Sequence, residues 1–368
     1  MKEKNPNQQI AEVFYRLNAG ATVDADLIAE TFSLILTNPI VKNRDLQLGA
    51  FLTGLMVRGP SVREVITLIR TALNIDGLTR YKPNLPAGEK IIGVAGSGKK
   101  GYKTFNISTS ACLVASASGA FVAKPGSSAT SSVSGSKDFM NIVGAKILDP
   151  YEMIKVLLST RFGLFSIEEL IPKFDAVYGG KIFSPTPLSF AFPAVVNPIS
   201  CDGILYGLSH PNIQLALDVF VELGCDNVIV VSSTSDKIHY IDELSTLEHN
   251  LIGRINGGNV GNIEELDVTQ ITQHPSGSPD ALGQGGSLIE NVQIALNVLR
   301  GKSEGPREDT VALNAAVILV LAEKTKTLEE GFNLAIETIK SGAAFRKLEE
   351  FIEATGGSKK ALSIITGG

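Results

Sequence analysis

The sequence contains no tryptophan, few aromatic residues and no excess of positive charge. Aromatic side chains make up 6% of its 368 residues, and the formal net charge at pH 7 is −5. Proteins that bind nucleic acids usually present a basic surface, and those that bind single strands add aromatic rings on which bases stack. The composition therefore argues against a broad nucleic-acid-binding surface, although Lys99, Lys100 and Lys103 form one local basic cluster.

Cysteine is also scarce, and no apolar run is long enough to cross a bilayer. Cys112, Cys201 and Cys225 are far apart and lack the spacing of metal ligands. A small, odd number of cysteines is typical of reduced, mostly buried thiols in the cytoplasm. The mostly apolar segment 311–322 is shorter than the roughly 20 residues of a membrane-spanning helix. The first residues are polar and lack the apolar core of a signal peptide. We therefore expect a soluble, cytoplasmic protein.

Hydrophobic periodicity divides the chain into a small helical part and a larger α/β part. Apolar residues recur at helical spacing from about residue 8 to residue 75, and Ser61 and Glu64 fit a capping box that opens the last of these helices. From residue 90 onward, expected strands alternate with helices, and the Val/Ile run 228–231 is typical of a buried parallel strand. We predict an α/β protein with a mainly parallel central sheet and surrounding helices. The predicted parts are a helical domain at 1–80, to which a later segment can contribute, a hinge at 81–89 and an α/β domain at 90–368.

The most informative stretch runs from Gly93 to Thr109. An expected strand at 91–92 leads into Gly-Val-Ala-Gly-Ser-Gly, and Thr104-Phe-Asn-Ile-Ser-Thr109 follows before a segment of small residues that we expect to be helical. Glycines allow positive φ and bring backbone N–H groups close to a ligand. Such N–H groups, at a turn or at the start of a helix, favour anions and above all phosphates. Taken alone, the pattern fits a phosphate-binding turn and an ordinary glycine turn equally well.

A second polar loop, residues 124–136, follows the strand expected at 120–123. Lys124 begins it, and most of the following residues are serine, threonine or glycine. An ammonium surrounded by hydroxyl and N–H donors suits the oxygens of a diphosphate. A serine-rich loop is more often only a polar connection. Two loops of this kind joined by one helix favour an anion site.

These two loops resemble the donor-binding loops of the anthranilate phosphoribosyltransferase family, which is part of the nucleoside phosphorylase-like phosphoribosyltransferases. That family has a Gly-Thr-Gly-Gly-Asp turn, then Thr-Phe-Asn-Ile-Ser-Thr, then a Lys-His-Gly-Asn-Arg loop that ends in Ser-Gly-Ser. The chain keeps Thr104–Thr109 intact and keeps Lys124 and Gly126 in register. Similarity extends over nearly the whole chain, at Ser131, Ser132, Ser134, Gly135, Ser136 and Asp138 and at 48–55, 290–291, 307, 313–316 and 329–332.

The resemblance implies a pentosyltransferase that uses phosphoribosyl diphosphate and Mg²⁺. The fold would be a helical domain, which makes a homodimer, hinged to an α/β domain, with the donor in the cleft between them. Loss of diphosphate from C1 of the ribose leaves an oxocarbenium-like centre, so the protein mainly positions groups and neutralises charge. No catalytic residue is therefore assigned. The donor-binding residues implied by the resemblance are Gly93, Gly96, Ser97, Thr104, Asn106, Ser108, Thr109, Lys124, Ser131, Ser132 and Ser136.

Asp242 and Glu243 form a carboxylate pair beyond the strand expected at 228–231. Mg²⁺ bound to a diphosphate typically takes one or two carboxylates and several waters. An Asp-Glu pair is, on its own, most often a solvated surface pair. The resemblance implies instead that Asp242 and Glu243 bind the metal, with Ser108 as a further ligand. The four histidines of the chain are scattered, and no role is assigned to them.

The sequence departs from the family pattern on the acceptor side. The acidic residue of the glycine turn is replaced by Ser97, and the loop after it is longer and basic. No arginine is present near 178–181, where the family binds the anthranilate carboxylate, and lysine does not reproduce the fork of a guanidinium. Losing one charge-assisted hydrogen bond costs about 1.5–3 kcal/mol. We therefore expect a small aromatic or heterocyclic acceptor that is less anionic than anthranilate, next to Pro125, Ser127 and Lys181.

Two other functions fit the same sequence. A nucleoside or nucleotide phosphorylase shares the architecture and would consume phosphate instead of releasing diphosphate. A non-catalytic paralogue that binds another anion or nucleic acid would explain the altered glycine turn and the lysine cluster at 99–103. Magnesium-dependent turnover of the donor separates the transferase from both.

Overall fold

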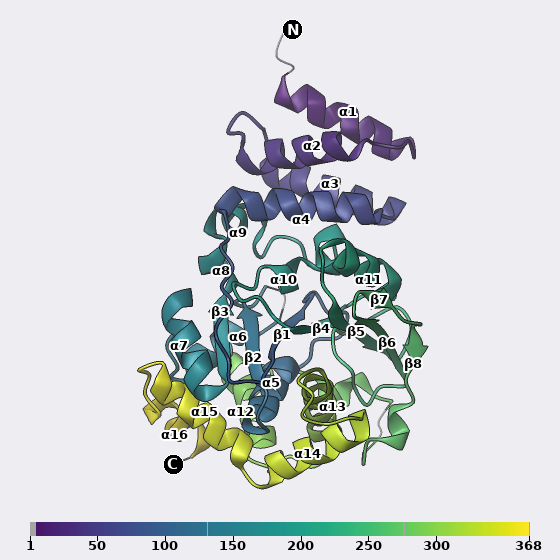
Figure 1. The fold of residues 1–368 in the computed structure, drawn as a ribbon. Helices are drawn as coiled ribbons and strands as arrows, with labels where there is room; N and C mark the ends of the chain where they lie inside the picture. Colours follow the sequence, from purple (N-terminus) through teal and green to yellow (C-terminus); the bar gives the residue numbers. More distant parts are fainter. Residues whose placement is uncertain (1–4, 131, 275–276, 368) are drawn as a thin grey trace.

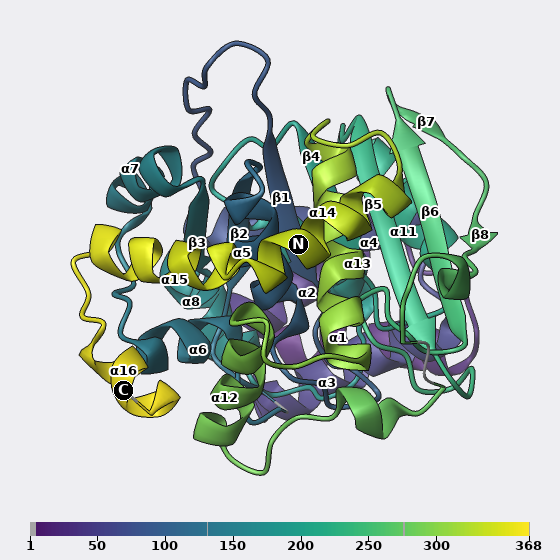
Figure 2. The same ribbon diagram turned by 90° about the horizontal axis from the view of Figure 1, so that it is seen from below.

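The computed structural model describes residues 5–130, 132–274 and 277–367, and it confirms an α/β architecture with a mainly parallel sheet. The strands follow the order β3-β2-β1-β4-β5-β6-β7, with β8 paired to β6. Pairing is parallel from β3 through β5 and antiparallel from β5 to β8. Figure 2 shows β6, β7 and β8 together at one edge of the sheet. The strands are β1 Ile91–Gly96, β2 Phe121–Gly126, β3 Phe162–Ser166, β4 Gly203–Gly207, β5 Asn227–Thr234, β6 His249–Asn256, β7 Asn259–Val260 and β8 Glu264–Glu265.

A layer of helices at the N-terminal end covers one side of the α/β part (Figure 1). It contains α1 Pro6–Asn18, α2 Ala25–Thr37, α3 Arg44–Arg58 and α4 Val62–Asp76. The capping box predicted at the start of α4 is present, because Ser61 and Glu64 exchange side-chain and backbone hydrogen bonds. A later helix, α9 Pro172–Tyr178, joins this layer, since Asp76 accepts hydrogen bonds from the backbone N–H groups of Lys173 and Phe174, both at 2.9 Å.

The two faces of the sheet belong to two hydrophobic cores. Side chains alternate between the faces of a strand, and in β5 Ile229 and Val231 face one core while Val228 and Val230 face the other. The first core lies under α5 Ile107–Ala117, α12 Leu288–Leu299, α13 Pro306–Leu321, α14 Leu328–Lys340 and α15 Ala343–Ala354. The second core joins the sheet to the N-terminal helical layer through α10 Phe192–Val195 and α11 Ile213–Glu222.

The remaining helices connect these elements. Among the described residues, no helix combines the length and apolar character that crossing a bilayer requires. The three cysteines are free thiols, and Cys112 is buried. The other elements are α6 Ser136–Val143, α7 Pro150–Thr160, α8 Ile167–Leu170 and α16 Lys360–Thr366, with short 3-10 turns at Pro187–Phe190, Val268–Gln270 and Pro279–Leu282.

The parallel strands determine where the site lies. Ligands of open α/β sheets bind outside the carboxyl ends of the strands. The carboxyl ends of β1, β2, β4 and β5 lie at one edge of the sheet, so the loops that follow them gather there. The glycine turn predicted at 93–98 is in fact strand as far as Gly96, where β1 ends, and of its three glycines Gly98 alone has a positive φ, of 62°. The remaining turn after β1, the serine-rich loop that continues from the last residues of β2, and the carboxylate pair after β5 lie at this edge.

Candidate active site

A cavity of about 180 Å³ opens at this edge of the sheet, and both loops line it. The structure therefore brings together most of the residues that the sequence predicted to bind a donor, a metal or an acceptor. Ser131 lies outside the described residues. The predicted residues that line the cavity are Gly96, Thr104, Asn106, Ser108, Thr109, Lys124, Pro125, Ser127, Ser132, Ser136, Asp242 and Glu243.

The N-terminus of α5 forms one wall of the cavity. The first residues of α5, from Ile107 to Thr109, line it. A helix N-terminus carries partial positive charge and unpaired N–H groups, which favour an anion. Asn106 precedes the helix and connects both loops to α12, because its Nδ2 donates to the Gly135 carbonyl at 3.3 Å and its Oδ1 accepts from Asn291 at 2.8 Å. Asn106 therefore positions the helix end relative to the serine-rich loop.

Lys124 stands at the carboxyl end of β2 and reaches the same space. Its side chain is almost buried, with 4% of the residue exposed, and Nζ donates to the Ser108 hydroxyl at 3.2 Å. No carboxylate in the described part of the chain forms an ion pair with it. A buried ammonium without a counter-ion is costly unless an anion joins it. Lys124 thus adds a nearly buried positive charge, without a carboxylate partner among the described residues, to this wall of the cavity.

The serine-rich loop is held in shape by Asp138 at the start of α6 and by Glu168 of α8, whose Oε1 accepts from the Ser128 N–H at 2.6 Å. Asp138 Oδ2 accepts from the N–H of Ala129 at 2.7 Å and from that of Gly135 at 2.9 Å. Gly126, the last residue of β2, packs so closely on the Ser136 hydroxyl that a Cβ atom would overlap it. These contacts fold the loop back over the cavity, where its hydroxyl groups lie beside Lys124.

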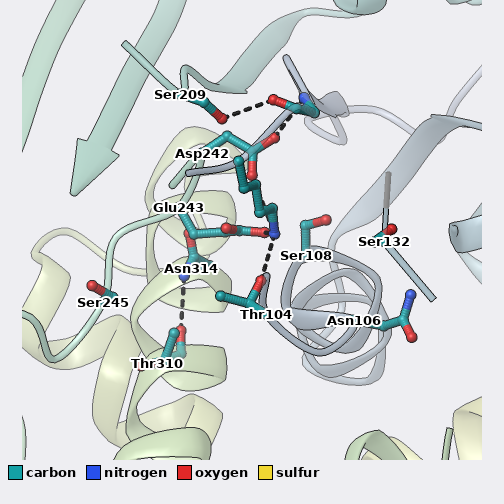
Figure 3. A network of polar contacts seen from close by, with 12 residues as sticks. Thr104, Asn106, Ser108, Ser132, Ser209, Asp242, Glu243, Ser245, Thr310 and Asn314 are labelled. Carbon is teal, nitrogen blue, oxygen red and sulfur yellow. Dashed lines mark hydrogen bonds and ion pairs between the residues drawn. The ribbon is translucent and has the colours of Figure 1, made fainter. Parts of the chain in front are cut away.

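Asp242 and Glu243 enter the cavity from the opposite side, beside Thr104 and Ser108 (Figure 3). Both carboxylates are buried, with 6% and 2% of the residues exposed. Their backbone is fixed, because Asn314 of α13 donates to the Leu244 carbonyl at 2.7 Å and accepts from the Leu244 N–H at 3.2 Å. The backbone next to the two carboxylates is therefore held in place by α13.

Lys100, one residue of the basic cluster at 99–103, occupies the space between these carboxylates. Lys100 Nζ lies 2.5 Å from Glu243 Oε1, 3.2 Å from Asp242 Oδ1 and 2.8 Å from Thr104 Oγ1. Burial alone would lower the pKa of Lys100, but the two carboxylates outweigh it and hold this pKa above its ordinary value. Burial and the charge of Asp242 raise the pKa of Glu243, and the Lys100 ammonium opposes this rise. In the sequence, only the longer, basic loop after the glycine turn pointed to a lysine in this position.

The chemistry of the pair suits a cation. Carboxylate and hydroxyl oxygens are ligands that Mg²⁺ prefers, and Glu243 Oε2 is buried without a hydrogen-bond partner in the described part of the chain. Among the described residues, no group of three or more His, Cys, Asp or Glu side chains is arranged to hold a metal ion. The oxygens of Asp242 and Glu243 could therefore supply part of the ligand set of a divalent ion, and the donor would have to supply the rest. In the structure, the cation between these oxygens is the Lys100 ammonium.

A second cavity of about 390 Å³ adjoins the first and shares the glycine turn and the serine-rich loop with it. Its far wall is aromatic, since Phe174 packs on Tyr178 and on Phe192 with ring centroids 5.0 Å apart in both pairs. Lys99 Nζ donates to the Tyr178 hydroxyl at 3.1 Å, and burial lowers the pKa of Lys99 to about 8. Two acids, Glu168 and Asp175, also line this cavity.

Three predicted site residues lie elsewhere. Gly93 is in the interior of β1, where a Cβ atom would come within 2.9 Å of the Cys201 sulfur, and it borders a separate cavity. The Ser97 hydroxyl accepts from the Ser209 N–H at 2.8 Å and fastens the glycine turn to the loop after β4, while Ser97 itself borders the second cavity. Lys181 Nζ pairs with Asp45 of α3 at 2.8 Å.

Comparison with known proteins agrees with this geometry. Residues 88–345 match the glycosyl transferase family, a/b domain. The chain is 29% identical over 346 residues to the anthranilate phosphoribosyltransferase of Acetivibrio thermocellus, covering 92% of this chain and 95% of that protein. It is 30% identical over 350 residues to that of Petrotoga mobilis, covering 91% and 94%.

Solved structures show the same fold. The anthranilate phosphoribosyltransferase of Thermus thermophilus matches with a TM-score of 0.76 at 23% identity, over 93% of this chain and 99% of that one. The Saccharomyces cerevisiae enzyme, solved in complex with PRPP and Mg, matches with a TM-score of 0.78 at 21% identity, over 95% and 98%. By its sequence and its fold, the chain belongs to the anthranilate phosphoribosyltransferase family of glycosyltransferases.

Proposed function

We propose that this protein transfers a phosphoribosyl group from phosphoribosyl diphosphate, with Mg²⁺, to a small aromatic or heterocyclic acceptor other than anthranilate. The observation that carries the donor half of the proposal is the Lys124 ammonium. It is nearly buried, has no carboxylate partner in the described residues, and lies beside the N-terminus of α5, where it donates to Ser108. A diphosphate supplies the negative charge that this arrangement is missing.

The residues around the cavity support the chemistry of this transfer. When the bond between C1 and the diphosphate oxygen breaks, the electron pair leaves with the diphosphate, and the ribose becomes oxocarbenium-like. Lys124 and the N–H groups at the start of α5 stabilise the growing negative charge without reorganising, because the fold already holds them in place. Mg²⁺, when bound, supplies further charge neutralisation at the diphosphate. The nearby oxygen groups are those of Ser108, Asp242 and Glu243, and Lys100 pairs with the two carboxylates.

The second cavity supports an acceptor that is less anionic than anthranilate. In the described part of the chain, no arginine lines it, and Lys181 is directed to Asp45 instead. The cation that does line it, Lys99, has a lowered pKa and donates to Tyr178. Glu168 and Asp175 would repel a carboxylate there. The aromatic wall suits a planar ring that carries a nucleophilic nitrogen or carbon.

A screen of acceptors with the donor tests the proposal. Purified protein is incubated with phosphoribosyl diphosphate, Mg²⁺ and a panel of ring compounds with and without a carboxylate, and released diphosphate is measured. We expect release with uncharged aromatic amines or heterocycles that clearly exceeds release with anthranilate. If anthranilate were the best acceptor, the acceptor half of the proposal would fail. Consumption of phosphate with a nucleoside, and no diphosphate release with any acceptor, would instead indicate a phosphorylase.

A further inference from the structure

The ammonium of Lys100 lies within 3.2 Å of three oxygens and donates hydrogen bonds to two of them, while Asp242 Oδ1 is within ion-pair distance but has no hydrogen-bond partner in the described part of the chain. Two belong to Asp242 and Glu243, at 3.2 and 2.5 Å, and the third is the Thr104 hydroxyl at 2.8 Å. Only 19% of the Lys100 side chain is exposed, so this is an internal ion pair and not a surface contact. A single positive charge thus lies where two buried carboxylates converge.

The loop that carries Lys100 is fastened to the segment that carries the carboxylates. The Gly98 N–H donates to Asp242 Oδ2 at 2.8 Å, and the Gly101 N–H donates to the Tyr240 carbonyl at 2.8 Å. At Gly101 a Cβ atom would lie 2.6 Å from the His239 Cα, so the two backbones approach as closely as glycine allows. The loop therefore holds the backbone of Lys100 beside the pair, and the ammonium has little freedom to leave.

We propose that Lys100 is the resident cation of the Asp242–Glu243 pair, and that its ammonium takes the place of a divalent ion and keeps Mg²⁺ from binding tightly there. The ammonium contacts one oxygen of each carboxylate, and a metal ion that bound these same oxygens would have to share its space. Two cations cannot occupy one set of ligands, because the metal needs oxygens at 2.0–2.1 Å and repels a positive charge beside it.

This inference rests on the proposed function, because it concerns which cations neutralise the negative charge of the diphosphate in the same cavity. A diphosphate in the cavity would meet Lys100 on the side of the carboxylates and Lys124 on the side of β2. A divalent ion carried in by the donor would then meet the Ser108 hydroxyl, away from the pair, in place of the hydrogen bond that this hydroxyl accepts from Lys124. Lys100 belongs to the basic loop between β1 and α5.

Binding of Mn²⁺ without donor or acceptor tests the inference. Free Mn²⁺ is measured by electron paramagnetic resonance in titrations of the wild-type protein, of Lys100→Met and of Lys99→Met. Lys99 belongs to the same loop but contacts Tyr178 and not the carboxylates, so its variant is the matched control. We expect Lys100→Met to gain one Mn²⁺ site that is roughly 10–100-fold tighter than any site of the wild type, and Lys99→Met to resemble the wild type. The added substitutions Asp242→Asn and Glu243→Gln should remove that new site.

Tight Mn²⁺ binding by the wild type that the Asp242→Asn and Glu243→Gln substitutions abolish would overturn the inference. This arm needs no Lys100 variant, so it decides the question even if Lys100→Met folds poorly. The titration also separates this inference from the proposed function. If the protein releases no diphosphate but Lys100→Met gains the Mn²⁺ site, the proposed function fails and the inference about Lys100 stands. If the protein releases diphosphate and the wild type binds Mn²⁺ tightly at the carboxylate pair, the inference about Lys100 fails and the proposed function stands.

Discussion

Replacement of Lys124 by methionine removes the charge on which donor binding depends while keeping most of the side-chain volume. Lys124 is nearly buried and its Nζ donates to Ser108. In the donor complex this ammonium would form charge-assisted hydrogen bonds to diphosphate oxygens, and one such bond contributes about 1.5–3 kcal/mol. Since about 1.4 kcal/mol changes an equilibrium constant tenfold, Lys124→Met should weaken donor binding roughly tenfold to a hundredfold.

The same substitution should not destabilise the protein. Lys124 has no carboxylate partner among the described residues, so the folded state loses no ion pair and no longer buries an unpaired charge. Titration calorimetry with phosphoribosyl diphosphate and Mg²⁺ measures the affinity, and thermal denaturation measures the stability. We expect weaker binding together with an equal or higher melting temperature.

Lys137→Met is the matched control. Lys137 lies on α6 close to the same loop, but its ammonium pairs with Glu169 at 3.2 Å and with Glu168 at 3.7 Å, and the residue does not line the cavity. Its variant should bind the donor as the wild type does. Unchanged donor affinity in Lys124→Met would refute the reasoning, and so would an equal loss of affinity in both variants.

Two further predictions concern the second cavity and the helical layer. Burial lowers the pKa of Lys99 from 10.5 to about 8, so between these values the folded state binds fewer protons than the unfolded state, and stability rises with pH. Lys99→Met should therefore raise the melting temperature at pH 7, with a gain that shrinks as the pH approaches 10.5; a gain that is independent of pH would contradict this. The homodimer stays a prediction, for which exposed apolar side chains such as Ile40, Leu46 and Val57 offer a surface on the helical layer. Light scattering should give twice the chain mass of 39.0 kDa, and a monomer at micromolar concentration would disprove it.

Periodicity and local signals predicted much of the fold. The expected strands at 91–92, 120–123 and 228–231 correspond to β1, β2 and β5, and the helices expected near residues 215, 290, 310 and 330 are α11 to α14. The capping box at Ser61 was visible because a cap depends on residues three apart. The antiparallel edge from β6 to β8 was not predicted, since pairing between segments distant in sequence leaves no comparable local pattern.

The candidate site, too, has parts that the sequence predicted and parts that it did not. Its two loops were predicted because their motifs are contiguous and match a known family, and the parallel sheet brings them to one edge. The position of Lys100 was not predictable, because it depends on the path of a longer loop and on its contacts with Tyr240 and Asp242. The aromatic cavity likewise combines residues of the serine-rich loop with Phe174, Tyr178 and Phe192, which are distant from that loop in the sequence.

A crystal structure with phosphoribosyl diphosphate and Mg²⁺ is the most direct test of the account. It should show the diphosphate between the start of α5 and the serine-rich loop, with an oxygen within hydrogen-bond distance of Lys124 Nζ. Donor density that lies elsewhere, or a cavity that stays empty at saturating donor, would contradict the assignment of this cavity as the donor site.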